Sequence, residues 1–178
     1  MSHRLFIGIR PPLTVRETLI DTMEALDGAR WQDDEQLHLT LRFVGEVERA
    51  DANDLADALA SIAWRPFEVS LHGVSHFEHK GMPNAIWARV TPTPELEGLR
   101  AKIDRICDLA GQGRETRRFT PHITIARLNR HSGPIVGWLA RQSGLRASWQ
   151  VDRFALFESH LRTSGAQYEL VAQYPLRG

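Results

Sequence analysis

Hydrophobic and polar residues alternate along several stretches of the chain, as they do in half-buried β-strands, whose successive side chains point to opposite faces. Other stretches place apolar residues three or four positions apart, which is typical of amphipathic helices. The alternation predicts strands over residues 4–10, 37–44, 67–77, 85–91, 120–127, 148–159 and 168–176. The wider spacing predicts helices from the Pro11-Pro12 pair to Gly28, over 50–64, from Thr93 to Gly111 and around 134–143. This mixture indicates an α+β fold.

The two halves of the chain repeat the same pieces. Each half contains several strands, one or two helices, and one strand in which histidine and threonine are separated by an apolar residue. A weak repeat of this kind is what an internal duplication leaves behind. The length of 178 residues fits one domain made of two similar lobes.

Composition narrows the class of protein. Hydrophobic residues make up 42% and charged residues 25%, the balance of a soluble globular protein, and no apolar run is long enough to span a membrane. The single cysteine, Cys107, excludes an internal disulfide framework, favours the cytoplasm, and lies on the apolar stripe of a predicted helix. The formal net charge of zero gives no long-range attraction to nucleic acid, so a phosphate would be held by local contacts. We expect a cytoplasmic monomer without a cofactor.

Two predicted strands carry the same polar pair. "LHLTLRFVG" places His38 and Thr40 on one strand face, and "FTPHITIAR" does the same with His122 and Thr124. The apolar residues of these strands, which we expect to face the core, are Leu39, Leu41, Phe43, Ile123 and Ile125. A single strand histidine is usually structural, but two such motifs in one chain exceed what chance spacing gives.

Two histidines and two threonines facing one cleft suit phosphodiester hydrolysis without a metal. Imidazole titrates near neutral pH, so one ring can act as general base and the other as general acid. Threonine hydroxyls can donate hydrogen bonds to the non-bridging oxygens of one phosphate. Strand periodicity does not say which histidine is the acid and which is the base.

The segments "HLTLRFVGEV" and "FTPHITIAR" resemble the paired H-x-T-x motifs of the 2H phosphoesterase superfamily. Nearly the whole chain resembles the bacterial RNA 2′,3′-cyclic phosphodiesterases, once called 2′-5′ RNA ligases, including "RLFIGIRPP" and the closing "FALFESHL" and "GAQYELVAQYPL". The resemblance implies one bilobal, duplicated LigT-like domain over residues 1–178. Two antiparallel sheets would line a central cleft, with helices outside and one motif (38–41 and 122–125) from each lobe.

The resemblance also implies an activity, the hydrolysis of RNA 2′,3′-cyclic phosphodiester ends to 2′-phosphomonoesters. His38 would be the proton donor to the departing 3′ oxygen and His122 the proton acceptor that activates water. Thr40 and Thr124 would hold the phosphate, and Arg127 follows the second motif as a further phosphate ligand. Strict alternation points Arg127 away from the cleft, so this role requires the strand to end or bulge first. The substrates would be RNA ends, tRNA fragments among them, or cyclic nucleotides, and the family's older name implies a reversible 2′-5′ ligation as well.

Other assignments remain open from the sequence alone. Strand alternation places Arg42 on the His38 face, where it is a further candidate for a phosphate contact. His72, His76 and His79, with Glu78 nearby, are the alternative that would bind a metal, although they straddle a strand end and a loop. The same cleft could also serve a phosphodiesterase for 2′,5′-linked oligonucleotides or small cyclic phosphates. A non-catalytic module that binds RNA ends is the last alternative.

Overall fold

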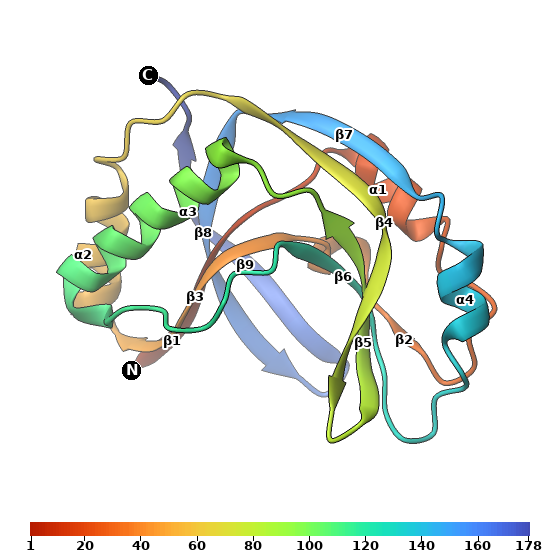
Figure 1. The fold of residues 1–178 in the computed structure, drawn as a ribbon. Coiled ribbons are helices and arrows are strands. Elements are labelled where there is room, and N and C mark those ends of the chain that lie inside the picture. Colours follow the sequence, from red (N-terminus) through yellow and green to blue (C-terminus); the bar gives the residue numbers. More distant parts are fainter.

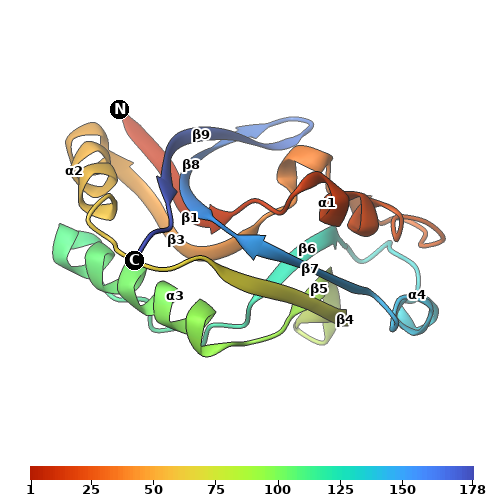
Figure 2. The ribbon, with the colours of Figure 1, turned by 90° about the horizontal axis from the view of Figure 1, so that it is seen from above.

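The computed structural model describes residues 1–178 as one antiparallel nine-stranded sheet flanked by helices (Figures 1 and 2). The strands are β1 (Ser2–Ile9), β2 (Arg30–Trp31), β3 (Leu39–Glu48), β4 (Phe67–His79), β5 (Met82–Val90), β6 (His122–Arg127), β7 (Arg146–Val151), β8 (Arg153–Arg162) and β9 (Gly165–Pro175). The helices are α1 (Leu13–Ile20), α2 (Arg49–Leu59), α3 (Pro94–Cys107) and α4 (Val136–Arg141). A 3-10 turn covers Asp34–Gln36, and a π turn covers Asp108–Gln112.

The sheet consists of two halves that meet at its centre. The strand order is β7-β4-β5-β6 in one half and β3-β1-β8-β9 in the other, with β2 added beside β6. Strands β3 and β6 pair only through Leu39 and Ile123. The expected α+β class with antiparallel strands is confirmed, whereas the two sheets expected from the sequence are joined through this one residue pair. Each half contributes its motif at the junction, which brings the two motifs together.

The helices lie in two groups at opposite ends of the molecule. Helices α2 and α3 lie side by side at one end, and α1 and α4 lie near β7 at the other (Figures 1 and 2). Burial of their apolar faces fixes α2 and α3, and the fully buried side chains are Leu55, Leu59, Leu96, Leu99, Ile103 and Cys107. The Thr93 side chain accepts a hydrogen bond from the Leu96 amide, which confirms the expected helix start. None of the helices combines the length and apolar character that crossing a membrane requires.

The first helix is shorter than its apolar spacing predicts. It ends at Ile20 instead of Gly28, and the chain then turns, with Ala25 at a left-handed φ of 58°. The backbone oxygen of Thr22 is freed from the helix and accepts a hydrogen bond from Nε1 of buried Trp138, at 2.9 Å. Leu26 stays buried without being helical. Packing against α4 therefore overrides the local helical pattern.

The predicted strand 148–159 is two strands. The chain breaks at Asp152, so that β7 pairs with β4 in one half of the sheet while β8 pairs with β1 and β9 in the other. The polar pair Asp152-Arg153 interrupts the apolar pattern there, and the four residues that follow, Phe154–Phe157, are all buried. Periodicity reports burial but carries no information about a change of partner strand.

Candidate active site

Both motifs open into one pocket of about 380 Å³ at the junction of the two half-sheets. His38, Thr40, His122, Thr124 and Arg127 all line it. The apolar residues between them face the core as expected, and those with at most 3% exposure are Leu39, Leu41, Ile123 and Ile125. A slightly larger cavity of about 420 Å³ contains none of the motif histidines and threonines, so its size does not make it the catalytic candidate.

A β-bulge follows the threonine in both motifs. In the pairing of β3 with β1, Leu41 has no partner, and in the pairing of β6 with β5, Ile125 has none. A bulge inserts one residue and reverses the alternation beyond it. On β6 the reversal brings Arg127 to the pocket, as its expected role requires. The two halves thus repeat the bulge as well as the motif.

The bulge on β3 corrects the expected orientation of two side chains. Phe43, expected in the core, is 44% exposed, lines the pocket and stacks on Phe6 with ring centroids 5.9 Å apart. Arg42, expected beside His38 by alternation, pairs across the sheet with buried Ile7 and is only 5% exposed. The expected faces are wrong because strict alternation assumes an unbroken strand.

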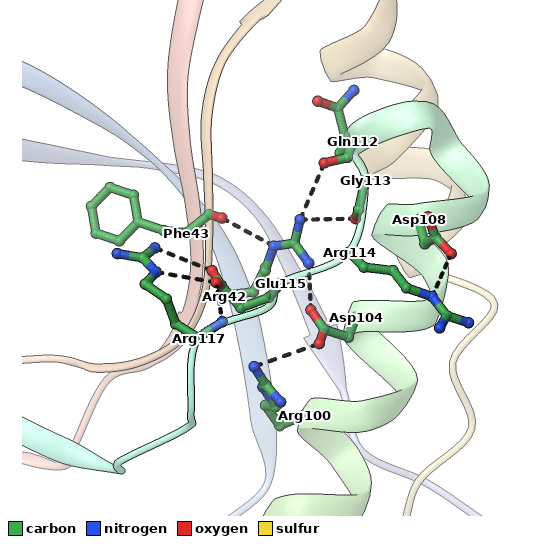
Figure 3. A network of polar contacts seen from close by, with 10 residues as sticks. All are labelled: Arg42, Phe43, Arg100, Asp104, Asp108, Gln112, Gly113, Arg114, Glu115 and Arg117. Carbon is green, nitrogen blue, oxygen red and sulfur yellow. Dashed lines mark hydrogen bonds and ion pairs between the residues drawn. The ribbon is translucent and has the colours of Figure 1, made fainter.

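The Arg42 guanidinium is bonded to protein oxygens (Figure 3). It donates to the backbone oxygens of Phe43, Gln112 and Gly113 at 3.0, 3.2 and 3.0 Å and forms an ion pair with Asp104 of α3. This arrangement ties the end of α3 and the following loop to β3. Arg42 is part of the pocket lining. Its guanidinium N–H groups, however, bond backbone oxygens of the loop and do not point into the pocket.

Gly8 allows β1 to approach the first motif closely. It pairs with Thr40 beside the bulge, and a Cβ atom at Gly8 would lie 2.8 Å from the backbone oxygen of Leu39. We expect Gly8→Ala to displace the backbone that carries His38 and Thr40. The expected cost is ~1–3 kcal/mol of unfolding free energy, as for other overpacked sites, with a clear fall in turnover.

Chemical denaturation and steady-state kinetics of Gly8→Ala measure both effects. Gly45→Ala is no matched control, because Gly45 has φ of 90° and alanine is strained there. Gly144 has no positive φ, and a Cβ added to it would meet no atom within 4 Å, so Gly144→Ala is the control and should leave activity unchanged. Unaltered stability and turnover in Gly8→Ala would contradict the close approach.

Aromatic rings enclose His38. Phe6 of β1, Phe157 of β8 and Tyr168 of β9 place their ring centroids 5.9, 4.5 and 5.5 Å from the imidazole. The side chain is 7% exposed, and neither ring nitrogen has a protein hydrogen-bond partner. Both nitrogens are covered from solvent, and a buried polar group without a partner is costly, so a phosphate that reaches this imidazole after a small movement of the rings would gain a hydrogen bond.

The surroundings of His38 favour its neutral form. Burial lowers its pKa from 6.5 to about 4. The backbone of Gln36 opposes this shift, and the positive charges of Arg10 and Arg16 add to it. Both arginines are held by Asp34, which lies in the 3-10 turn just before the motif. In the empty pocket His38 is therefore an uncharged imidazole at neutral pH.

His122 has a similar but more open aromatic enclosure. The rings of Phe77 on β4 and Trp87 on β5 lie 4.8 and 5.4 Å from its imidazole. Its Nδ1 lies 2.7 Å from the backbone oxygen of Thr120, so Nδ1 is the donor and Nε2 is left as the acceptor in the neutral ring. Burial first, and then the charge of Arg127, lower the pKa of His122.

A basic rim surrounds the pocket and was not identified from the sequence. Arg100 of α3 and Arg117 and Arg118 of the loop before β6 line it. Glu115, which also lines it, receives two side-chain hydrogen bonds from Arg117 at 3.1 Å, and these hold its pKa at about 2. The run "RETRRF" ahead of the second motif is the available signal, but its composition is also that of an ordinary polar linker.

The alternative metal ligands do not gather. His72, His76 and His79 project from β4 without bringing three ligand atoms together, and His76 Nε2 instead meets Glu78 Oε1 at 3.0 Å. Cys107 is fully buried, and burial raises the pKa of its thiol to about 11, which confirms the expected packing role.

Comparison with known proteins agrees with this geometry. The sequence model of the 2′-5′ RNA ligase superfamily matches residues 11–163. Two relatives named RNA 2′,3′-cyclic phosphodiesterase are each 32% identical to this chain. The one from Aeropyrum pernix aligns over 77% of this chain and 80% of its own length, and the one from Thermus thermophilus over 98% and 91%. A third, from Geobacillus stearothermophilus, is 29% identical and aligns over 89% of this chain but 51% of itself.

Solved structures show the same fold. A crystal structure of a Thermus thermophilus protein has a TM-score of 0.79 and 26% identity, with 98% of both chains covered. The crystal structure of E. coli LigT complexed with 3′-AMP has a TM-score of 0.80 and 23% identity, with 99% of both chains covered. The chain therefore belongs to the 2′-5′ RNA ligase superfamily.

Proposed function

We propose that the protein hydrolyses the 2′,3′-cyclic phosphodiester end of RNA to a 2′-phosphomonoester by acid–base catalysis with two histidines. The observation that carries the proposal is the meeting of His38, Thr40, His122 and Thr124 in one pocket from two separate halves of the sheet. The names of the relatives, RNA 2′,3′-cyclic phosphodiesterase, support the substrate class.

The reaction places one histidine on each side of the phosphorus. His122 Nε2, which is the acceptor nitrogen of that ring, takes a proton from water as the water oxygen bonds to phosphorus. The bond from phosphorus to the 3′ oxygen breaks on the opposite side, and His38 gives its proton to that oxygen. Thr40 and Thr124 donate hydrogen bonds to the non-bridging oxygens, and Arg127 adds positive charge at the rim.

The low pKa of His38 places a condition on its role as acid. The ring is neutral in the empty pocket and must gain a proton before it can donate one. Substrate binding raises the pKa of His38, because a phosphodiester anion beside the imidazole favours its charged form. We infer that His38 is protonated when the phosphate binds. The surrounding rings then exclude water from the acid while the bond breaks.

The donor set of the pocket supports chemistry by imidazole groups. Its lining holds two histidines, hydroxyl, amide and guanidinium groups, and one carboxylate, Glu115, which Arg117 engages. A catalytic metal would require carboxylates, thiolates or grouped imidazoles directed at one point. We therefore expect turnover to persist in excess EDTA.

The basic rim supports an RNA strand as the substrate over a free cyclic mononucleotide. Arg118 has no carboxylate partner, and Arg100 contacts one carboxylate, that of Asp104, at 3.5 Å. Guanidinium groups bind phosphate through two parallel hydrogen bonds. tRNA fragments with cyclic ends fall within this class. If a 5′ hydroxyl attacks phosphorus in place of water, the bond to the 3′ oxygen breaks in the same way and the ends are joined through a 2′-5′ bond. Microscopic reversibility then makes this ligation reversible at the same pocket.

Loss of the threonine hydroxyls should reduce turnover without unfolding the protein. Thr40→Val and Thr124→Val keep the side-chain shape and remove one donor to the phosphate. Each should cost ~1–3 kcal/mol of transition-state stabilisation, about a 5- to 150-fold fall in kcat/KM. Thr91→Val, at an exposed position outside the pocket, should retain full turnover. Large losses of melting temperature at unchanged turnover would make the two threonines structural.

The proposal as a whole is tested by incubating the protein with a short RNA that ends in a 2′,3′-cyclic phosphate, in the presence of EDTA. We expect conversion to the 2′-phosphomonoester. A 2′,5′-linked dinucleotide and an unmodified RNA serve as competing substrates. Cleavage of the 2′,5′ bond in preference to the cyclic end would favour that alternative. Tight RNA binding without any turnover would indicate a non-catalytic binding module.

A further inference from the structure

Two histidines and two glutamates gather away from the catalytic pocket, on three neighbouring strands. His3 on β1 places Nδ1 2.8 Å from Oε1 of Glu158 on β8. His160 on β8 places Nε2 2.9 Å from Oε2 of Glu169 on β9 and 4.0 Å from Oε2 of Glu158. One ligand atom from each of Glu158, His160 and Glu169 lies within 4.8 Å of the others. None of the four residues lines the pocket that holds the two motifs.

The sheet register places two like charges opposite one another in this cluster. Glu158 and Glu169 are direct partners across the antiparallel β8–β9 pair. Like charges directly opposed on neighbouring strands are destabilising, and Glu158 is largely buried, with its side chain 18% exposed. The arrangement therefore favours a positive charge between the glutamates.

We propose that Glu158, His160 and Glu169 form a binding site for a divalent transition metal ion of the zinc type, in which His3 holds Glu158 in place through its other carboxylate oxygen. Imidazole nitrogen with carboxylate oxygen is a donor set that Zn²⁺ accepts in tetrahedral geometry, whereas Mg²⁺ and Ca²⁺ prefer oxygen alone. Bonds of ~2.0–2.1 Å separate tetrahedral ligand atoms by about 3.4 Å. His160 Nε2 lies 2.9 and 4.0 Å from the two carboxylate oxygens, which brackets that value, so small side-chain rotations suffice.

The ligands come from rigid elements, which favours a defined site. Glu158 and His160 are two residues apart on β8 and so share a strand face, while His3 and Glu169 come from the strands on either side. A bound ion would link β8 and β9, and the contact of His3 with Glu158 would connect β1 to them. Phe157 and Tyr168, next in sequence to the two glutamates, contact the His38 ring. The ion would thus brace the strands that enclose His38 without taking part in the reaction.

The test is a zinc titration of the tag-free protein, followed by competition with a chromophoric chelator. We expect one equivalent to bind with a dissociation constant of ~10 µM or tighter. Residues that only hold a metal ligand in place change metal affinity by about 10- to 100-fold when they are replaced. Loss of a ligand itself, as in His160→Ala, should therefore weaken binding by ~100-fold or more. Glu169→Gln, which keeps the side-chain size, should weaken it as well. Cobalt bound at the site should give the intense visible absorption of tetrahedral coordination.

The matched control is His76→Ala, since His76 also pairs with a glutamate, Glu78, at 3.0 Å but has no third ligand. This variant should bind zinc like the wild type. Zinc should raise the melting temperature of the wild type and of His76→Ala but not of His160→Ala, because the ion binds only the folded site. Absence of wild-type binding at this level, or equal affinity in His160→Ala, would overturn the proposal. Neither result bears on turnover in EDTA, which tests the catalytic account separately.

Discussion

Replacing either motif histidine with alanine should lower kcat by ~10²–10⁴, the range for loss of a general acid or base. His122→Ala removes the nitrogen that accepts the proton of water, and His38→Ala removes the proton donor to the 3′ oxygen. Neither ring belongs to the main hydrophobic core, so the variants should fold, although His38→Ala leaves a cavity among Phe6, Phe157 and Tyr168 that lowers stability. Steady-state kinetics on a cyclic-phosphate-ended RNA measure the effect, and circular dichroism checks the fold.

Two comparisons separate catalysis from binding and from general damage. His76→Ala removes a histidine that lies outside the pocket and should retain full turnover. Binding of a 2′-phosphomonoester product should weaken much less than kcat falls, since the threonines and Arg127 remain. The double variant should be little worse than the single ones because the two groups act in one step. Turnover near the wild-type rate in either single variant would remove that histidine from the mechanism.

The second large effect is a pH dependence of stability that arises from His38. Its pKa is about 4 in the folded protein, lowered by burial, and near 6.5 when the chain is unfolded. Above pH 6.5 both states are neutral at this residue. Between pH 6.5 and 4 the unfolded chain binds a proton that the folded protein does not, so the free energy of unfolding falls with decreasing pH. The full difference amounts to about 3 kcal/mol.

Urea denaturation from pH 7.5 to 4.5 measures this slope in wild type and in His38→Gln, which cannot titrate. The variant should lose less stability over that interval, so the two stability curves should converge or cross as the pH falls. The control variant His76→Ala removes an imidazole that lies nearer the surface. Its stability curve should follow the wild-type curve more closely than the curve of His38→Gln does. Parallel curves for wild type and His38→Gln would show that His38 titrates normally and is not shielded by the aromatic rings.

The same titration connects stability with catalysis. A phosphate ligand that protonates His38 must take up a proton on binding near pH 6, where the free ring is neutral. Calorimetry of a 2′-phosphomonoester in buffers of different ionisation enthalpy counts that proton. Uptake should be clear in wild type and reduced in His38→Gln. Uptake that instead disappears in His122→Gln would exchange the two roles and make His122 the acid.

The faces of the two motifs were predictable because burial imposes period two on a strand. Leu39, Leu41, Ile123 and Ile125 could face the core only if His38, Thr40, His122 and Thr124 faced the other way. That inference needs no knowledge of the partner strands. The resemblance to a duplicated fold predicted that the two motifs meet in one pocket. In the structure, the pairing of β3 with β6 at the centre of the sheet brings them together.

The bulges were not predictable from the same pattern. An inserted residue at Leu41 reverses Arg42 and Phe43, and the sequence contains no irregularity that marks it, since leucine suits either position. Gly8 permits the close approach of β1 at that point, but a glycine in an apolar strand has several explanations. At Arg127 the need for a bulge could be stated in advance, because the family motif and strict alternation disagreed there.

Long-range packing accounts for the remaining differences. The break at Asp152 and the early end of α1 depend on which strand or helix lies alongside, and local spacing does not encode this. The aromatic enclosure of His38 likewise draws Phe6, Phe157 and Tyr168 from three strands far apart in the chain. Strand patterning can place each of these residues, but their convergence on one imidazole depends on the fold.

The most direct test of the central claim follows one RNA end through a single reaction by phosphorus NMR. The substrate is a short RNA with a 2′,3′-cyclic phosphate, and the reaction contains wild-type protein, excess EDTA and water enriched in ¹⁸O. Our account predicts loss of the cyclic phosphate signal, appearance of a 2′-phosphomonoester alone, and one ¹⁸O atom in the product from direct attack by water. Accumulation of a 3′-phosphomonoester, or turnover that stops in EDTA and returns with a divalent ion, would contradict it.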